Sequence, residues 1–428
     1  MIQSLDKIKQ FLKDESLRRK ILFTLLIFLI FRVFAFLPVP SVDRQALKTI
    51  FGQSAFFSLL DIFSGGTLIN FSVMALGLGP YINASIILQL FTVIVPKLEQ
   101  LSKEGEYGRA KINQYTRFLT LPITIAQSIG MYILLKNQNV MSNLGFAEFI
   151  GFVVTITAGS FILMWLGELI SEFGIGNGIS MLIFAGIMAR IPVTFGKALT
   201  TATQENAIAM TVIGVFMILV IAAVVFVNQA VRRVPVYYAK RIRGNRVYQG
   251  SSNYLPLRLN QAGVIPIIFA ISFVLFPQLV GSFLANAGNP ALQGFARLLV
   301  STFNPQGVLY NALYFLLVIA FTFFYTVVVF NPEKIAEEIQ KHGGFIPGIR
   351  PGTATKEYLQ RIVYRITSFG ALFLGIIAIL PAIVAAATDS SNFIIGGTGV
   401  LIVVSVVLES FKLMETQAAM KSYEKYQS

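Results

Sequence analysis

Cysteine and histidine, two side chains often used for covalent and metal chemistry, are nearly absent from this 428-residue chain. It has no cysteine, which excludes disulfides and thiolate sites, and its single histidine, His342, argues against a histidine metal site. The glycine-rich run GIGNGIS at 174–180 is not followed by lysine, so it predicts a tight turn before a helix rather than a phosphate cradle. Because no carboxylate pair or nucleophile–base motif stands out either, we expect no enzyme, no metal and no cofactor.

Ionisable side chains are also scarce inside the apolar stretches of the chain. They are Arg32, Glu168, Glu172, Arg190 and Glu409, and most lie near the ends of their stretch. Ion-coupled transporters usually need charged groups near the membrane midplane. The pattern therefore disfavours such a transporter, and a transporter for a small neutral solute stays open as an alternative.

The apolar stretches offer isoleucine at helical spacing instead. Ile82 and Ile86 lie one helical turn apart, and Ile179 and Ile183 repeat that spacing. Apolar side chains stacked from several helices can form a constriction that excludes water and ions. Isoleucine is equally the usual filler of lipid-facing and packing surfaces, so the spacing alone leaves both interpretations open.

The elements that must position these side chains are membrane helices. The chain is 55% hydrophobic and 13% charged, and its mean hydropathy is +0.72, which is far from the average of soluble proteins. Lipid cannot satisfy free backbone polar groups, so each long apolar stretch should be a helix. We expect ten spans, at residues 21–37, 71–95, 118–135, 149–170, 179–193, 207–227, 264–284, 309–330, 366–387 and 393–408.

Basic residues fall almost entirely in every second connection between these spans. That side of the predicted topology holds 27 of the 34 lysines and arginines. By the positive-inside bias, both termini and the long loops 228–260 and 331–365 are expected in the cytoplasm. Five spans fall in residues 1–195 and five in 196–428, so two similar halves would be inverted relative to each other.

The segment 55–70 breaks the pattern of long spans. It reads as a short apolar helix with Asp61, followed by the break Ser64-Gly65-Gly66. A helix too short to cross the bilayer predicts a re-entrant piece covered by protein. The alternative is an amphipathic helix lying on the membrane surface.

The two long basic loops contain structure of their own. Two β-favouring runs flank Gly244-Asn245 and predict a hairpin. A helix is expected at 332–341, followed by a stiff Gly-Pro segment around Arg350. Their length and rigid turns favour docking surfaces, although a solvated positive-inside loop would explain their charge equally well.

Eight motifs in the expected loops and spans make the chain resemble the SecY family, the central subunit of the bacterial protein-conducting channel. The resemblance covers essentially the whole sequence. The motifs are FSGG (63–66), PYINASIILQL (80–90), EGEYGRAKINQYTR (104–117), GIGNGIS (174–180), RRVPVYYAKR (232–241), NQAGVIPIIFA (260–270), IPGIRPG (346–352) and GGTG (396–399).

The resemblance implies an all-α polytopic membrane fold, in which ten transmembrane helices in two inverted five-helix halves form a clamshell around a central pore. A short re-entrant plug helix at 57–70 would seal the pore, with the plug residues Phe57, Asp61, Phe63, Ser64, Gly65, Gly66 and Thr67. The implied pore ring is Ile82, Ile86, Ile179, Ile183, Ile265, Ile268 and Ile402. In the seventh and tenth helices, Val264 and Leu401 are one-residue alternatives to Ile265 and Ile402.

The family's function and partners follow as expectations from the same resemblance. Unfolded polypeptides would cross the bacterial inner membrane, and hydrophobic segments would leave sideways into lipid through a lateral gate carrying Ser85 and Gln127. Expected partners are the small membrane subunits SecE and SecG, the SecA motor ATPase, the ribosome through its RNA, signal sequences, nascent polypeptides and membrane lipid. The implied docking residues are Arg232, Arg233, Lys240, Arg241, Arg243, Arg246 and Arg350.

Overall fold

A computed structural model describes most of the chain. The described residues are 14–40, 42, 47, 61, 64, 66–138, 140–141, 144–200, 204–238, 241–243, 246–248, 252–284, 290–305, 307–388 and 397–427. The predicted plug residues Phe57, Phe63 and Gly65 and the predicted docking residue Lys240 lie outside them.

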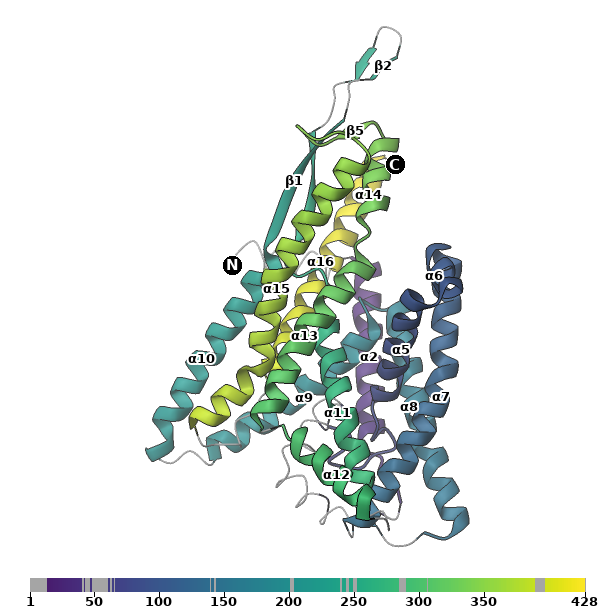
Figure 1. Ribbon diagram of the computed structural model, residues 1–428, viewed down its shortest axis with the longest axis vertical. Helices are drawn as coiled ribbons and strands as arrows, with labels where there is room; N and C mark the ends of the chain where they lie inside the picture. The colour runs from purple at the N-terminus through teal and green to yellow at the C-terminus, as the bar shows by residue number, and fades with distance from the viewer. Residues whose placement is uncertain are drawn as a thin grey trace.

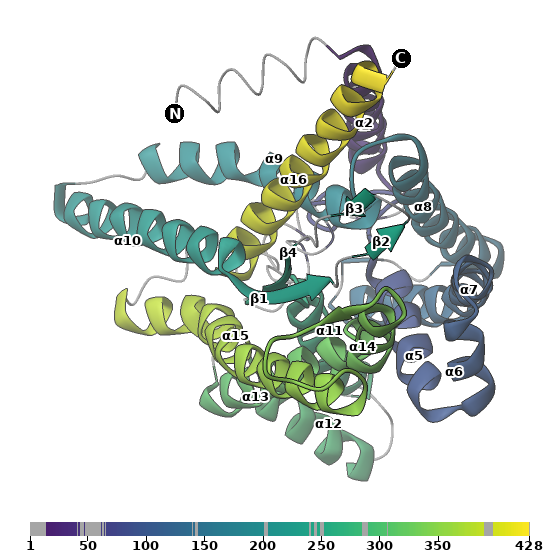
Figure 2. The same cartoon turned by 90° about the horizontal axis from the view of Figure 1, so that it is seen from above.

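Each of the ten predicted stretches overlaps one long helix, in the expected order. They are α2 (Glu15–Phe36), α5 (Gly79–Ile94), α7 (Glu106–Asn137), α8 (Phe146–Phe173), α9 (Gly178–Thr200), α10 (Gln204–Gln229), α11 (Ile265–Leu284), α13 (Val308–Val329), α15 (Thr353–Thr388) and α16 (Gly397–Gln427). In both views α5, α7 and α8 lie on one side of the bundle, and α10, α13 and α15 lie on the other (Figures 1 and 2).

Several of these helices have the length and hydropathy that a bilayer demands. Among the described residues, four helical stretches meet both criteria, and a bent pair raises the number to five. They begin at α7, α8, α13 and α15, and the bent pair is α5 with α6 (Pro96–Lys103). The chain is therefore a multi-span membrane protein, and the full set of ten spans remains a prediction.

The predicted second span is wrong at its start, because α5 begins at Gly79 and not at Phe71. Phe71 and Gly77 have positive φ angles of 42° and 58°, which a right-handed helix cannot contain. At the other end Pro96 follows α5, and α6 continues at an angle of 101° to it. Residues 66–78, directly before α5, therefore form a turn-rich segment instead of a helix.

Two shorter helices occupy the later connections. Helix α14 (Pro332–Lys341) has the predicted bounds, and it starts where the Asn331 side chain accepts hydrogen bonds from the backbone N–H groups of Glu333 and Lys334. Helix α12 (Pro290–Thr302) was not predicted, and it packs on α11. Its apolar side chains recur on one face of an otherwise polar connection, which is too weak a signal for a spanning helix.

A small sheet stands beyond the helix bundle (Figure 1). Strands β1 (Val231–Tyr238), β4 (Ser252–Arg258) and β5 (Gly344–Phe345) pair antiparallel in the order β4-β1-β5. Strands β2 (Arg241–Arg243) and β3 (Arg246–Tyr248) pair antiparallel, with Arg243 opposite Arg246, which confirms the predicted hairpin. The longer β1–β4 pairing around that hairpin was not predicted.

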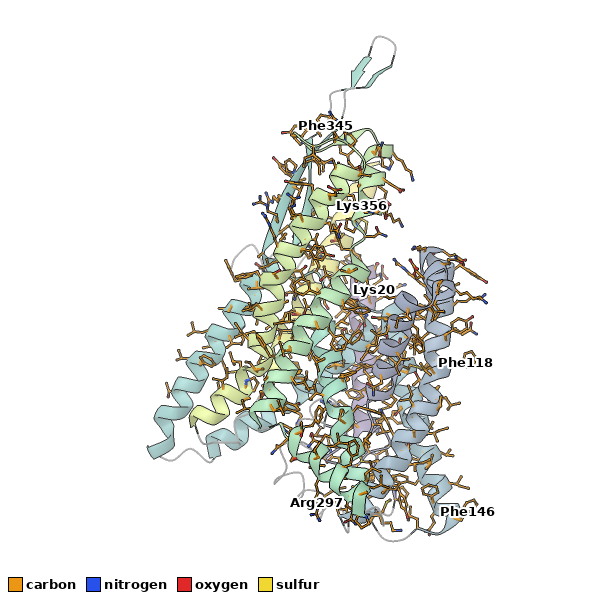
Figure 3. All side chains as sticks on the ribbon, viewed as in Figure 1. Lys20, Phe118, Phe146, Arg297, Phe345 and Lys356 are labelled. Atoms are coloured by element: carbon orange, nitrogen blue, oxygen red, sulfur yellow. The ribbon has the colours of Figure 1, made fainter. Side chains whose placement is uncertain are left out.

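Apolar side chains divide between a shared interior and an exposed belt. One buried cluster draws on α2, α7, α8, α9, α10, α11, α13, α15 and α16. On the outside, Phe118 of α7 and Phe146 of α8 are 66% and 81% exposed and point away from the bundle (Figure 3). A buried core combined with exposed apolar side chains on the outer surface is what a lipid environment favours.

Candidate functional site

The predicted ring residues come from four helices that are far apart in the sequence. Ile82 and Ile86 lie on α5, Ile179 and Ile183 on α9, Ile265 and Ile268 on α11, and Ile402 on α16. All seven are described, and none is exposed. Ile183, Ile268 and Ile402 belong to the large buried cluster, and Ile82 and Ile179 pack against it.

The helices that carry the ring residues touch one another in pairs. Helix α5 contacts α11, and α9 contacts α16. On α9, Ile179 lies beside α8, with its Cγ1 3.2 Å from where a Cβ on Gly167 would stand. The alternatives Val264 and Leu401 are buried as well. The ring therefore remains a prediction. Its seven members are buried or half-buried, and the choice between them and their one-residue alternatives stays open.

The predicted lateral gate brings together helices from both halves of the chain. Helix α11 contacts α5 and α7, and it also packs on α13. Ser85 on α5 is half-buried, and its hydroxyl lies 3.4 Å from the amide nitrogen of Gln89. Gln127 on α7 is half-buried too. A seam between α5–α7 and α11–α13 is where such a gate would have to lie.

The C-terminal root of the predicted plug is fixed by backbone hydrogen bonds to the end of α2. The Val39 N–H donates to Phe71 O at 3.0 Å, and the Val73 N–H donates to Leu37 O at 2.9 Å. The Thr67 hydroxyl lies within hydrogen-bond distance of Ser64 O and Met74 O, at 2.8 and 2.9 Å. These contacts hold the segment after Gly66 against the bundle.

Glycine is required where the root meets Ser64. Gly77 has a positive φ, and a Cβ built on it would stand 2.9 Å from the Ser64 Cα. Gly66 has a φ of 79° and carries the chain from Ser64 into the fixed root. Gly66, the last residue of the FSGG motif, therefore has a conformation that most other residues could adopt only with strain.

Asp61 is fully buried and anchors this turn. Its Oδ1 accepts hydrogen bonds from the N–H groups of Leu68 and Ile69, at 3.1 and 2.9 Å. Its Oδ2 lies 2.7 Å from Nη1 of Arg190 on α9. Neither of these last two atoms makes an aligned hydrogen bond, so the contact is a close ion pair. Burial raises the pKa of the Asp61 carboxyl, and the Arg190 guanidinium and the two N–H donors oppose that shift.

Sequence reasoning missed the partner of Asp61. Arg190 was recognised only as an ionisable group at the end of a span. A buried carboxylate and an arginine in a mostly apolar protein each need a compensating charge, and that requirement was the available signal. Arg32 on α2 was also left without a role, and its Nη2 donates to Ala185 O at 3.0 Å and to Gly186 O at 3.3 Å on α9.

The described docking residues lie in the two basic loops, which join to form one structured platform. Strand β5 pairs with β1, so the two basic loops are joined. Their common core is Val234, Val236, Leu257, Ile339, Ile346, Leu359 and Val363. Arg232 and Arg233 are exposed on β1, and Arg350 is exposed just before α15. Arg241, Arg243 and Arg246 lie on the β2–β3 hairpin, and only their backbone is described.

A separate cavity of about 220 Å³ lies between α13 and α15, where both helices approach the platform. Its walls are mainly apolar and include Phe323, Val327 and Phe330, with Gln360 and Tyr364 on the opposite side. The predicted ring, plug, gate and docking residues do not line it. Lys356, which is labelled in Figure 3, lies one turn before Gln360 on α15. Its Nζ forms an ion pair with Oε1 of Glu333 at 3.0 Å.

Comparison with known proteins shows to which family the chain belongs. The SecY family model matches residues 72–411. The protein translocase subunit SecY of Streptomyces galbus is 44% identical over 433 aligned positions, which cover 96% of this chain and 97% of the relative.

Solved structures share the fold at lower identity. One is a SecY structure whose plug domain is described as stabilising the closed channel and maintaining a membrane seal. It has a TM-score of 0.68 at 21% identity and covers 94% of this chain and 93% of its own. Another is Sec61 in the canine ribosome–channel complex from the endoplasmic reticulum, with a TM-score of 0.67 at 20% identity and coverage of 93% and 92%. With the family model and the bacterial relative both spanning most of the sequence, the chain belongs to the SecY family.

Proposed function

We propose that this chain is a protein-conducting channel of the bacterial cytoplasmic membrane. The observation that carries the proposal is family membership over nearly the whole chain, together with the predicted ring isoleucines on four distant helices, none of which is exposed. A pore for unfolded chains cannot select by sequence, so its lining should be apolar and able to widen. Residues 1–195 and 196–428 would act as two inverted halves around it.

Sideways release of apolar segments is the second part of the proposal. The α5–α7 and α11–α13 helices meet through α11, and a gate at this seam would open directly to lipid. An apolar helix of sufficient length partitions into the bilayer once it has access. Ser85 and Gln127 would be polar residues on this route.

The driving energy would come from partners on the cytoplasmic side of the membrane. The charge pattern predicts that both termini lie on that side. The exposed arginines of the platform suit ribosomal RNA or an acidic protein surface. SecA and the ribosome are the proposed partners there, and the ribosome–channel complex of the canine relative supports the second. SecE and SecG are the proposed membrane partners, alongside signal sequences, nascent polypeptides and lipid.

The test is translocation of an unfolded precursor into proteoliposomes that contain the purified channel complex, driven by SecA and ATP. Arg350→Glu should lower the rate about tenfold or more, because a reversed charge at a docking contact is repulsive. Arg361→Glu is the matched control, since Arg361 is exposed on the adjoining α15. Equal rates for the two variants would remove Arg350 from the docking surface, and no translocation by the unaltered protein would reject the function.

A further inference from the structure

The pairing of Asp61 with Arg190 joins the plug segment to a helix that carries two predicted ring residues. Among the hydrogen bonds and ion pairs of Asp61 in the described part of the chain, Arg190 is the partner from another helix. The others lie within the same turn-rich segment. The ion pair is therefore the charged contact that fixes this turn to the bundle.

The position of Arg190 on α9 relates the pair to the ring. Ile183 and Arg190 are seven residues apart, so they share one face of the helix at a separation of about 10 Å along its axis. Asp61 therefore docks on the ring-bearing face of α9, about two turns beyond Ile183. The turn around Asp61 is therefore held about 10 Å along the α9 axis from Ile183, just beyond the predicted ring.

Gly66 lies beside the ion pair, where the turn that contains Asp61 meets the root. Gly66 has a φ of 79°, and the stem of Arg190 packs against it, with Cγ and Cδ 3.6 Å from where a Cβ would stand. Beyond Gly66 the root is tied to α2 by the backbone bonds of Phe71 and Val73. Asp61 is bonded to this root through the N–H groups of Leu68 and Ile69, so Arg190 contacts from α9 a turn that is itself held on the end of α2.

We propose that the Asp61–Arg190 ion pair is a latch, in which Arg190 positions the plug over the closed ring and releases it when α9 moves. The proposal rests on the channel function proposed above. The side chain of Asp61 is 1% exposed and that of Arg190 is 32% exposed, so solvent screens the carboxylate little. Separating the pair leaves a buried carboxylate without its countercharge, which makes the closed state strongly dependent on both residues.

Conductance of planar bilayers containing the full-length channel complex tests the latch in the absence of substrate. Asp61→Asn keeps the acceptor for Leu68 and Ile69 but removes the charge, and Arg190→Gln removes the other charge. Each should raise the frequency of resting openings by about tenfold or more. Lys136→Gln, which removes an exposed cation at the end of α7, is the charge-matched control and should not.

Two further variants separate a latch from a loss of structure. Arg190→Lys should restore closure, because a contact at one nitrogen needs a point charge and not a guanidinium fork. The double variant Asp61→Asn with Arg190→Gln should leak no more than the leakier single variant, because the two residues act through one interaction. Retained SecA-driven translocation by each variant would show that it is folded.

Ile183→Gly serves as the positive control for the channel itself. If it leaks and Asp61→Asn stays closed, the latch is wrong and the channel function stands. If the double variant leaks by the product of the two single effects, the residues act independently and the latch is again wrong. If Ile183→Gly and the charge variants all stay closed, the channel function fails and the latch fails with it.

Discussion

At the residue scale, a glycine without a side chain lets α8 approach the plug root closely. A Cβ on Gly159 would stand 1.9 Å from Val73 O, so no side chain fits there without movement. A Cβ on Gly151, two turns earlier in the same helix, would meet nothing within 4 Å. The two glycines therefore form a matched pair for mutation.

Gly159→Ala should destabilise the protein by about 1–3 kcal/mol, because α8 and the root must separate to admit the methyl group. Gly151→Ala should be neutral or stabilise by up to about 1 kcal/mol, as alanine is the better helix former. Thermal unfolding of the two variants in detergent measures the difference. A midpoint for Gly159→Ala at or above that of Gly151→Ala would contradict the packing described for α8.

The sequence predicts single residues well only where their surroundings are local. Asn177 accepts hydrogen bonds from the N–H groups of Ile179 and Ser180, so the GIGNGIS turn and helix start follow from neighbours in the sequence. The Asp61–Arg190 pair joins residues that are far apart in the chain. Composition shows that both charges need partners, but it does not say which partners.

At the element scale, the platform formed by the two basic loops has its own core. Leu359 on α15 is fully buried there, beside Val236 of β1 and Ile339 of α14. Tyr254 on β4 is 61% exposed on the same platform. The core holds the β1–β4–β5 sheet against α14 and α15.

Leu359→Ala should cost about 2–5 kcal/mol of platform stability, because the buried cavity it leaves cannot fully collapse. Amide hydrogen exchange in β1 and β4 should then accelerate, while exchange in α7 and α8 stays unchanged. Tyr254→Ala, a larger deletion at an exposed site, should have little effect. Faster exchange in Tyr254→Ala than in Leu359→Ala would show that the platform is held by other contacts.

Long apolar helices follow from the sequence because lipid leaves the backbone no other choice. The start of the second span did not, since the positive φ angles at Phe71 and Gly77 reflect contacts with Ser64 and the end of α2. The β1–β4 pairing was also missed, because it closes around a hairpin that already satisfies the local turn signal. Tertiary contacts override local pattern in both cases.

At the scale of the whole molecule, the account requires that interior isoleucines from α5, α9, α11 and α16 act together as one seal. None of them is exposed, although Ile82, Ile179 and Ile265 are only partly buried. The contacts of α5 with α11 and of α9 with α16 bring their helices together in pairs. The sequence supplied the residues through motifs and spacing. Closure of the four helices into one ring is a collective property that no single motif contains.

Resting ion conductance in planar bilayers tests this claim most directly. Replacing Ile82, Ile86, Ile183 and Ile268 by glycine should raise the resting leak at least about tenfold. The opening would be wider and would lack the apolar side chains that exclude water and ions. The matched control replaces four exposed isoleucines by glycine, namely Ile150, Ile218, Ile376 and Ile383. The account predicts a leak from the first set alone, and a first set that stays as tight as the unaltered channel would contradict it.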